Sequence, residues 1–140
     1  MIFSIEQMAQ DAKEVANELA SLSSQTKNQV LQSIADNLRA SSAEIIAANE
    51  CDMRLGREAN LDDAMLDRLM LDKDRIEGIA QAVEHIITLD DPVGDITKHT
   101  RRPNGLQIAK QRIPLGVIAM VYESRPNVTI DAAVLCFKAG

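Results

Sequence analysis

The sequence predicts an α/β fold that is mostly helical and contains the opening of a parallel sheet. Three observations favour this fold. Apolar residues recur at helical spacing up to about residue 90, a looser alternation surrounds the Asn104-Gly105 pair, and residues 117–122 form a short apolar run. These patterns are typical of amphipathic helices, of a β-hairpin and of a strand that is covered on both faces.

Five helices joined by short polar turns account for residues 1–90 and predict a bundle-like block. The first follows an apolar face from Ile5 to Leu22. The others begin at side chains that accept hydrogen bonds from free N–H groups: Ser23-Ser24, Ser41 in a capping box with Glu44, Asn60 or Asp62 ahead of a short helix over 63–70, and Asp72. The predicted core comes mainly from the second helix (Val30, Leu31, Ile34, Ala35, Leu38) and the fifth (Ile76, Ile79, Ala80, Val83, Ile86, Ile87).

A hairpin follows the only plausible boundary, which lies near Asp90. Residues 96–99 and 106–113 alternate loosely, and Arg101-Arg102-Pro103 widens the connection between them into an irregular loop. A bare two-stranded hairpin is marginally stable in water, so we expect it to pair with further chain.

The order strand, turn, helix describes residues 114–140. The apolar run 117–122 is the predicted strand, and the following helix has its apolar face at Val128, Ala132, Leu135 and Ala139, with Gly140 at the C-cap. This is the first half of a βαβ crossover. A parallel strand needs a neighbour, and we therefore expect the chain to be the front portion of a larger α/β protein.

Composition and charge narrow the classes of function. The net charge is −6, with 8 basic and 17 acidic side chains in residues 1–90 against 7 and 4 in residues 91–140. The acidic first segment disfavours nucleic acid. No apolar run is long enough for a membrane span, and the acidic, polar start does not resemble a signal peptide. We expect a cytoplasmic protein.

No pattern in the chain predicts nucleophilic or metal catalysis. Cys136 falls late in the last helix and reads as a small buried hydrophobe, whereas Cys51 lies between two acids that raise a thiol pKa. His85 and His99 are isolated, and no metal-binding spacing or G-x-G-x-x-G loop occurs. We expect neither a catalytic residue nor a metal site in this chain.

The turn at residues 122–127 is the strongest candidate site. It follows the predicted strand and precedes a helix N-terminus, where open α/β sheets bind ligands and free N–H groups favour anions. The guanidinium of Arg125 matches a phosphate or a carboxylate. Alternatively, Arg125 is a surface turn residue and Asn127 caps the helix.

The string P-L-G-V-I-x-x-V-Y-E-x-R-P-N-V-T-x-D-x-A-x-L-C-x-K-x-G, which ends at Gly140, resembles the γ-glutamyl phosphate reductase family of the aldehyde dehydrogenase superfamily. Further similar strings are Ala64-Met65-Leu66-Asp67-Arg68-Leu69, Asp91-Pro92-Val93-Gly94 and Lys27-Asn28-Gln29-Val30-Leu31. The resemblance implies the N-terminal part of an aldehyde-dehydrogenase-like fold. Residues 1–90 would be the helical block of the cofactor domain, 91–113 the hairpin of the oligomerisation extension and 114–140 the start of the NADP-binding domain.

The resemblance also implies an activity. The full-length enzyme would reduce L-glutamate 5-phosphate with NADPH to L-glutamate 5-semialdehyde and phosphate, in proline biosynthesis. It would act as a homo-oligomer, with glutamate 5-kinase as a candidate partner. The family's catalytic cysteine lies beyond this segment, so this chain alone would be inactive, and its residues do not distinguish NADPH from NADH.

The resemblance assigns roles to the turn. Tyr122, Glu123 and Ser124 would border the cofactor, and Arg125 and Asn127 would contact the substrate. The superfamily's oxyanion-site Asn aligns near Arg125 rather than at Asn127, so either residue could supply that contact. The alternative hypothesis belongs to another class of function. In it, the chain is a free-standing helical module that binds a partner protein, and residues 117–122 are an ordinary core segment.

Overall fold

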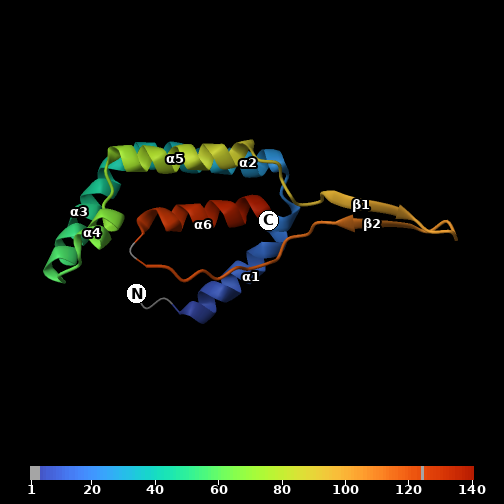
Figure 1. The fold of residues 1–140 in the computed structure, drawn as a ribbon, viewed down its shortest axis with the longest axis horizontal. Coiled ribbons are helices and arrows are strands. Elements are labelled where there is room, and N and C mark those ends of the chain that lie inside the picture. The colour runs from blue at the N-terminus through green and yellow to red at the C-terminus, as the bar shows by residue number, and fades with distance from the viewer. Residues whose placement is uncertain (1–3, 124) are drawn as a thin grey trace.

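The computed structural model describes residues 4–123 and 125–140, which form six helices and one antiparallel hairpin (Figure 1). The mostly helical composition and the hairpin confirm the predicted fold class. In chain order the elements are α1 (Ile5–Ser21), α2 (Ser24–Ala40), α3 (Ser42–Glu58), α4 (Asp63–Leu69), α5 (Lys73–Thr88), β1 (Ile96–Arg101), β2 (Gln107–Gln111) and α6 (Pro126–Ala139). None of the described helices is both long enough and apolar enough to cross a membrane.

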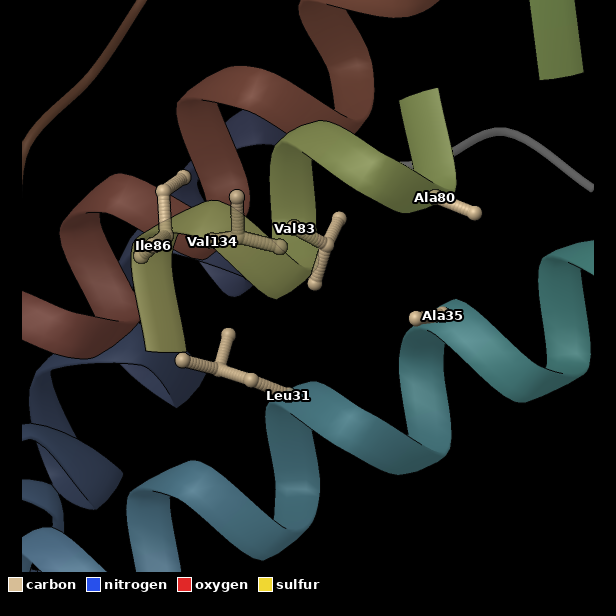
Figure 2. Close-up of a cluster of buried hydrophobic side chains, with 6 residues drawn as sticks. All are labelled: Leu31, Ala35, Ala80, Val83, Ile86 and Val134. Carbon is tan, nitrogen blue, oxygen red and sulfur yellow. The ribbon is translucent and has the colours of Figure 1, made fainter. Parts of the chain in front are cut away.

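The core lies where α2, α5 and α6 meet (Figure 2). Leu31, Ala35, Ala80, Val83 and Val134 are almost completely buried there. The residues from α2 and α5 recur at spacings of three and four, so each helix presents one apolar stripe to the other. The predicted core of the second and fifth helices is confirmed at its centre.

Helices α3 and α4 form an arm beside the three-helix core, and two features hold α4 and the residues after it against α3. The buried side chain of Asn49 donates to the carbonyl of Leu69 at 2.9 Å and accepts from the N–H of Leu71 at 2.7 Å. At Gly56, an added Cβ would lie 3.1 Å from Leu61 and 3.2 Å from Leu66. The glycine therefore permits the close approach of α4 to α3.

Most of the predicted caps are present. Ser23 and Asp62 accept from the N–H groups three residues on, at 3.1 and 2.7 Å, and Asp72 does the same at 2.7 Å. The capping box at Ser41 is wrong, because its side chain makes no capping bond. Ser41 is also the C-cap of α2, and its near-helical backbone does not aim the hydroxyl at the next helix.

The hairpin forms as the sequence predicts, with β1 extending to Arg101. The N–H of Arg102 donates to the carbonyl of Leu106 at 2.8 Å, and Gly105 takes the left-handed backbone (φ 89°) that the tight loop requires. Nearly all of the side chains of β1 and β2 are exposed.

The five predicted helices do not form one bundle. Helix α1 contributes no buried residue, and Ile5, Met8 and Val15 on its apolar face are all more than half exposed. Figure 1 shows α1 projecting away from α5. The helical period correctly located the helix, but an apolar face forms a bundle only where another element covers it.

Residues 117–122 do not form the predicted strand, and this segment runs without strand pairing along one side of α6 (Figure 1). Val121 is fully exposed, and Ile118 and Met120 are about half exposed. A strand requires a hydrogen-bonding neighbour, and the two strands among the described residues pair only with each other. The segment is thus neither a parallel strand nor the ordinary core segment of the alternative reading.

The orientation of α6 also differs from the prediction. Its most buried residues are Val134 and Lys138, whereas Leu135 on the predicted face is 53% exposed. Helix α6 is apolar on more than one side, so its periodicity could not identify the side that packs on α2 and α5. Gly140 ends the helix with a left-handed backbone (φ 85°), as expected.

We expect Leu31→Ala to lower the free energy of unfolding by about 2–5 kcal/mol, because it removes buried methyl groups and leaves a cavity. Urea unfolding followed by circular dichroism measures this change. Val30→Ala is the matched control on the same helix, where the side chain is 38% exposed, and its effect should stay below about 1 kcal/mol. Equal effects of the two substitutions would contradict the assigned core.

Candidate functional site

The candidate turn at residues 122–127 leads directly into α6, which begins at Pro126. Pro126 occupies the first helical turn, and Arg125 before it has the extended backbone expected ahead of a proline (φ −127°, ψ 96°). The carbonyl of Arg125 accepts from the N–H of Val128 at 3.1 Å, while its side chain makes no capping bond. The exposed guanidinium of Arg125 is therefore available to a ligand.

The side chain of Asn127 makes its hydrogen bond further along α6 and does not cap the start of the helix. Its Nδ2 donates to Oδ2 of Asp131 at 3.0 Å, one turn further on. The interpretation of Asn127 as a simple helix cap is thus wrong. Its side chain instead lines a pocket between the first turn of α6, the end of α4 and the first half of α5.

The other residues of the turn are placed less specifically. The hydroxyl of Tyr122 lies 2.7 Å from Oγ1 of Thr129, and this hydrogen bond ties the extended segment to α6. Glu123 is exposed, and Ser124 lies outside the described residues. The structure thus brings Asn127 into a pocket and leaves Arg125 and Glu123 at the surface.

Two arginines face the same pocket as Asn127. Arg75 is held in place, because its guanidinium donates to Oδ1 of Asp67 at 2.6 Å, to the carbonyl of Met70 at 3.1 Å and to the carbonyl of Asp67. Arg68 lies on α4 and is exposed. Neither arginine was a site candidate from the sequence, although Arg68 belongs to one of the family-like strings.

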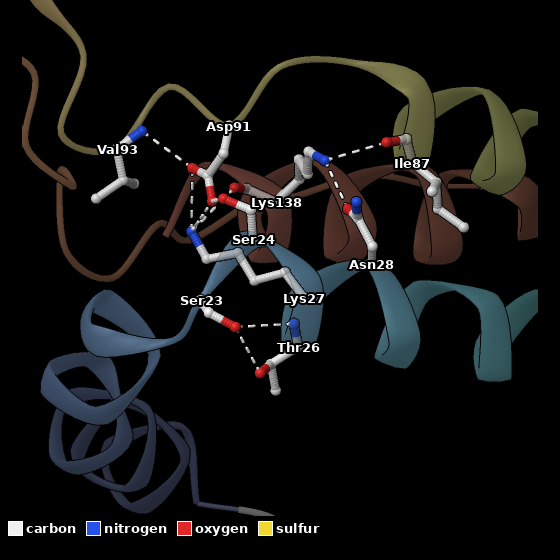
Figure 3. Close-up of polar contacts among 9 residues, drawn as sticks. All are labelled: Ser23, Ser24, Thr26, Lys27, Asn28, Ile87, Asp91, Val93 and Lys138. Carbon is white, nitrogen blue, oxygen red and sulfur yellow. Dashed lines mark hydrogen bonds and ion pairs between the residues drawn. The ribbon is translucent and has the colours of Figure 1, made fainter.

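A buried polar cluster lies at the other end of α6 (Figure 3). Lys27 is completely buried, and its Nζ lies 3.0 Å from Oδ2 of Asp91 and 3.3 Å from the carbonyl of Lys138. Nζ of Lys138 donates to Oδ1 of Asn28 at 2.7 Å and to the carbonyl of Ile87 at 3.3 Å. The cluster joins α2, the segment after α5 and the end of α6.

The electrostatics of Asp91 follow from this arrangement. Burial by itself would raise the pKa of Asp91, but the N–H of Val93, the ammonium of Lys27 and the hydroxyl of Ser24 all donate to its carboxylate, and together they bring the pKa below its ordinary value. Asp91 is the anionic centre that compensates the buried charge of Lys27.

Sequence reasoning missed this cluster, although a signal was present. Lys27 lies four residues before Leu31, which lies four before Ala35, and Lys138 lies four after Val134. Both lysines continue a buried stripe of their helix, where an ordinary surface lysine is not expected.

A second charged cluster is structural. Arg39 on α2 binds Glu77 of α5 through two hydrogen bonds of 2.9 and 2.8 Å and Glu84 through two of 2.5 and 3.0 Å. These hydrogen bonds from Arg39 lower the pKa values of both glutamates. Four of the five N–H donors of the Arg39 guanidinium are therefore used by the two carboxylates, and its charge is compensated within the protein.

Neither cysteine lies at the N-terminal end of its helix. Cys51 is exposed and Cys136 is half-buried. Within residues 4–123 and 125–140, no three His, Cys, Asp or Glu side chains are grouped as metal ligands would be.

Comparisons with known proteins identify similar chains over nearly the whole length. No family model matches. The chain is 55% identical over 136 residues (97% of its length) to a γ-glutamyl phosphate reductase of Shewanella denitrificans, and it covers 32% of that protein. The crystal structure of γ-glutamyl phosphate reductase from Thermotoga maritima superposes with a TM-score of 0.92 at 36% identity, covering 96% of this chain and 32% of that one. The corresponding Saccharomyces cerevisiae structure gives a TM-score of 0.91 at 31% identity, covering 99% and 35%. The chain thus spans about a third of the length of the relatives it matches.

We expect Asp91→Asn to lower the free energy of unfolding by about 3–5 kcal/mol at neutral pH, because it leaves the buried ammonium of Lys27 without its counter-charge. Denaturant unfolding measures this loss. Asp90→Asn is the control, because Asp90 is adjacent in sequence and its own side chain is exposed. This substitution should change the free energy of unfolding by no more than about 0.5 kcal/mol.

The same pair of variants tests the pH dependence. The lowered pKa of Asp91 means that its stabilisation is complete above about pH 4, the ordinary aspartate value, and is lost as the pH falls through the folded-state value. Asp91→Asn should therefore lose less stability than the unsubstituted chain over this acidic range. An equal acid sensitivity of the two proteins would show that the cluster does not act as described.

Proposed function

Because the chain belongs to the γ-glutamyl phosphate reductase family, we propose that it forms part of a cytoplasmic enzyme that reduces L-glutamate 5-phosphate with NADPH. The products are L-glutamate 5-semialdehyde and phosphate, and the reaction serves proline biosynthesis. The observation that carries the proposal is the 55% identity over 97% of the chain to a protein of that name.

The turn at the start of α6 supplies the binding residues of this proposal. The exposed fork of Arg125 binds the phosphate or the acyl group of the substrate, since a guanidinium matches such oxyanions bidentately. Asn127 donates to the substrate from the pocket behind the turn, and the N-terminal end of the α6 dipole adds a positive field. Tyr122, Glu123 and Ser124 are the residues proposed to contact the nicotinamide cofactor.

The division of labour follows from the chain's length relative to its relatives. The thiolate that attacks the acyl phosphate and the remainder of the cofactor site belong to the other two thirds of the enzyme. Nucleophilic catalysis needs an activated thiol. Cys51 lies in the middle of α3 and Cys136 near the C-terminal end of α6, so neither is at a helix N-terminus that would lower a thiol pKa. This chain contributes binding and positioning.

The proposed activity can be tested with a chimera. When this chain replaces the corresponding third of the Shewanella denitrificans relative, the chimera should oxidise NADPH in the presence of L-glutamate 5-phosphate, as the unmodified relative does. A folded chimera without activity, beside an active parent, would contradict the proposal.

The isolated chain should show no NADPH oxidation with the acyl phosphate, because it lacks an activated nucleophile. The measurement is the absorbance of NADPH with the purified chain, and the unmodified relative serves as the positive control. Turnover by the 140-residue chain would refute the division of labour.

We also expect the isolated chain to self-associate through the unpaired segment at residues 117–122. Its apolar side chains and free backbone groups form an edge of the kind that pairs with another chain. Sedimentation velocity should show dimers or larger species, and Val121→Lys should shift them towards monomer. Leu55→Lys, at an exposed apolar residue of α3, should leave the association unchanged. A monomeric unsubstituted chain at all concentrations would contradict this expectation.

A further inference from the structure

The pocket behind the candidate turn contains charged side chains that have no role in the proposed reaction as described above. It is formed by residues far apart in sequence: Arg68 and Arg75 from one side, and Asn127 and Asp131 from α6. Ile79 of α5 and Pro126 add apolar surface. The site therefore exists only because α6 packs across the α4–α5 junction.

The charges of this pocket are not all compensated within the described residues. Arg75 is committed to Asp67 and to two backbone carbonyls. Arg68 takes part in no hydrogen bond or ion pair among the described side chains, and the carboxylate of Asp131 accepts only from Asn127. One cationic fork and one carboxylate thus remain without a counter-charge at the same pocket.

We propose that this pocket binds the zwitterionic end of an α-amino acid. The guanidinium of Arg68 receives the α-carboxylate in a bidentate contact, and the carboxylate of Asp131 receives the α-ammonium. A zwitterion carries both complementary charges on one carbon, so a single ligand neutralises both side chains. Asn127 keeps Asp131 oriented through its hydrogen bond of 3.0 Å.

The presence of Asp131 decides between a zwitterion and a simple anion. A phosphate or a dicarboxylate without an amino group would place negative charge in the same pocket as the uncompensated carboxylate of Asp131, and the like charges would repel each other. The inference deepens and rests on the proposed function: the amino-acid end of the substrate occupies the pocket. Its acyl phosphate end then extends to the exposed Arg125, the residue before Pro126 of the pocket.

Amide NMR of the isolated chain tests the pocket without any turnover. L-Glutamate, titrated at constant ionic strength, should shift the amide resonances of Gly78, Asn127 and Asp131 in a saturable way. Glutarate lacks the amino group, and 4-aminobutyrate lacks the α-carboxylate, so each should bind at least about tenfold more weakly, since each loses a charged hydrogen bond. Equal binding of glutarate would overturn the contact with Asp131, and no saturable shift with L-glutamate would overturn the site.

Two substitutions separate the roles of the charged groups. Arg68→Gln and Asp131→Asn should each weaken L-glutamate binding by about tenfold, and Arg68→Lys should weaken it less because the charge remains. Arg54→Gln, at an arginine of α3 that pairs with Glu58, is the matched control and should bind normally. Normal binding by Arg68→Gln would refute the assignment.

The two experiments distinguish a failure of the pocket from a failure of the reductase assignment. A failed titration beside an active chimera would remove the pocket and leave the proposed function standing. An inactive chimera beside saturable, Arg68-dependent binding would remove the function and leave the amino-acid site.

Discussion

The buried ion pair between Lys27 and Asp91 is the constraint on which the arrangement of this chain depends. A fully buried ammonium needs a counter-charge and further acceptors, since otherwise its desolvation would oppose folding. Asp91 supplies the charge and the carbonyl of Lys138 supplies an acceptor. The requirement therefore fixes the start of α2, the segment after α5 and the end of α6 relative to one another. Gly140 closes the same corner, because a Cβ there would lie 2.8 Å from Val93.

Helix α6 connects this buried cluster to the candidate site. Its C-terminal end is anchored by the two lysines, and its middle is packed through Val134. Its first two turns place Asn127 and Asp131 against the α4–α5 junction. The helix thus acts as a rigid connection between a buried charge cluster and a pocket at its opposite end. The exposed side of α6 and the unpaired residues 117–122 beside it are both apolar, which is the composition of surfaces that other chain segments cover.

The family-like strings correspond to different physical roles. Lys27 and Asn28 in one string, Asp91 in another and the Lys138 near the end all belong to the buried cluster. The string from Ala64 to Leu69 supplies Arg68 of the pocket and the carbonyl that binds Asn49. From the sequence, only the portion at residues 122–127 of these strings was assigned a binding role. The remaining polar residues are needed because they satisfy one another across distances of about a hundred residues along the chain.

The sequence by itself determined the helices, most of their caps, the hairpin with its Gly105 turn and the central core residues of α2 and α5. These features depend on local periodicity and on hydrogen bonds between residues a few positions apart, which a single sequence displays directly. Only the tertiary structure decided which side of α6 is buried, that α1 stands outside the helical block, that residues 117–122 remain unpaired and that Arg68 shares a pocket with Asp131. Each of these depends on whether a distant element is present to cover a face, to pair a backbone or to compensate a charge. Periodicity along one segment carries no information about that neighbour.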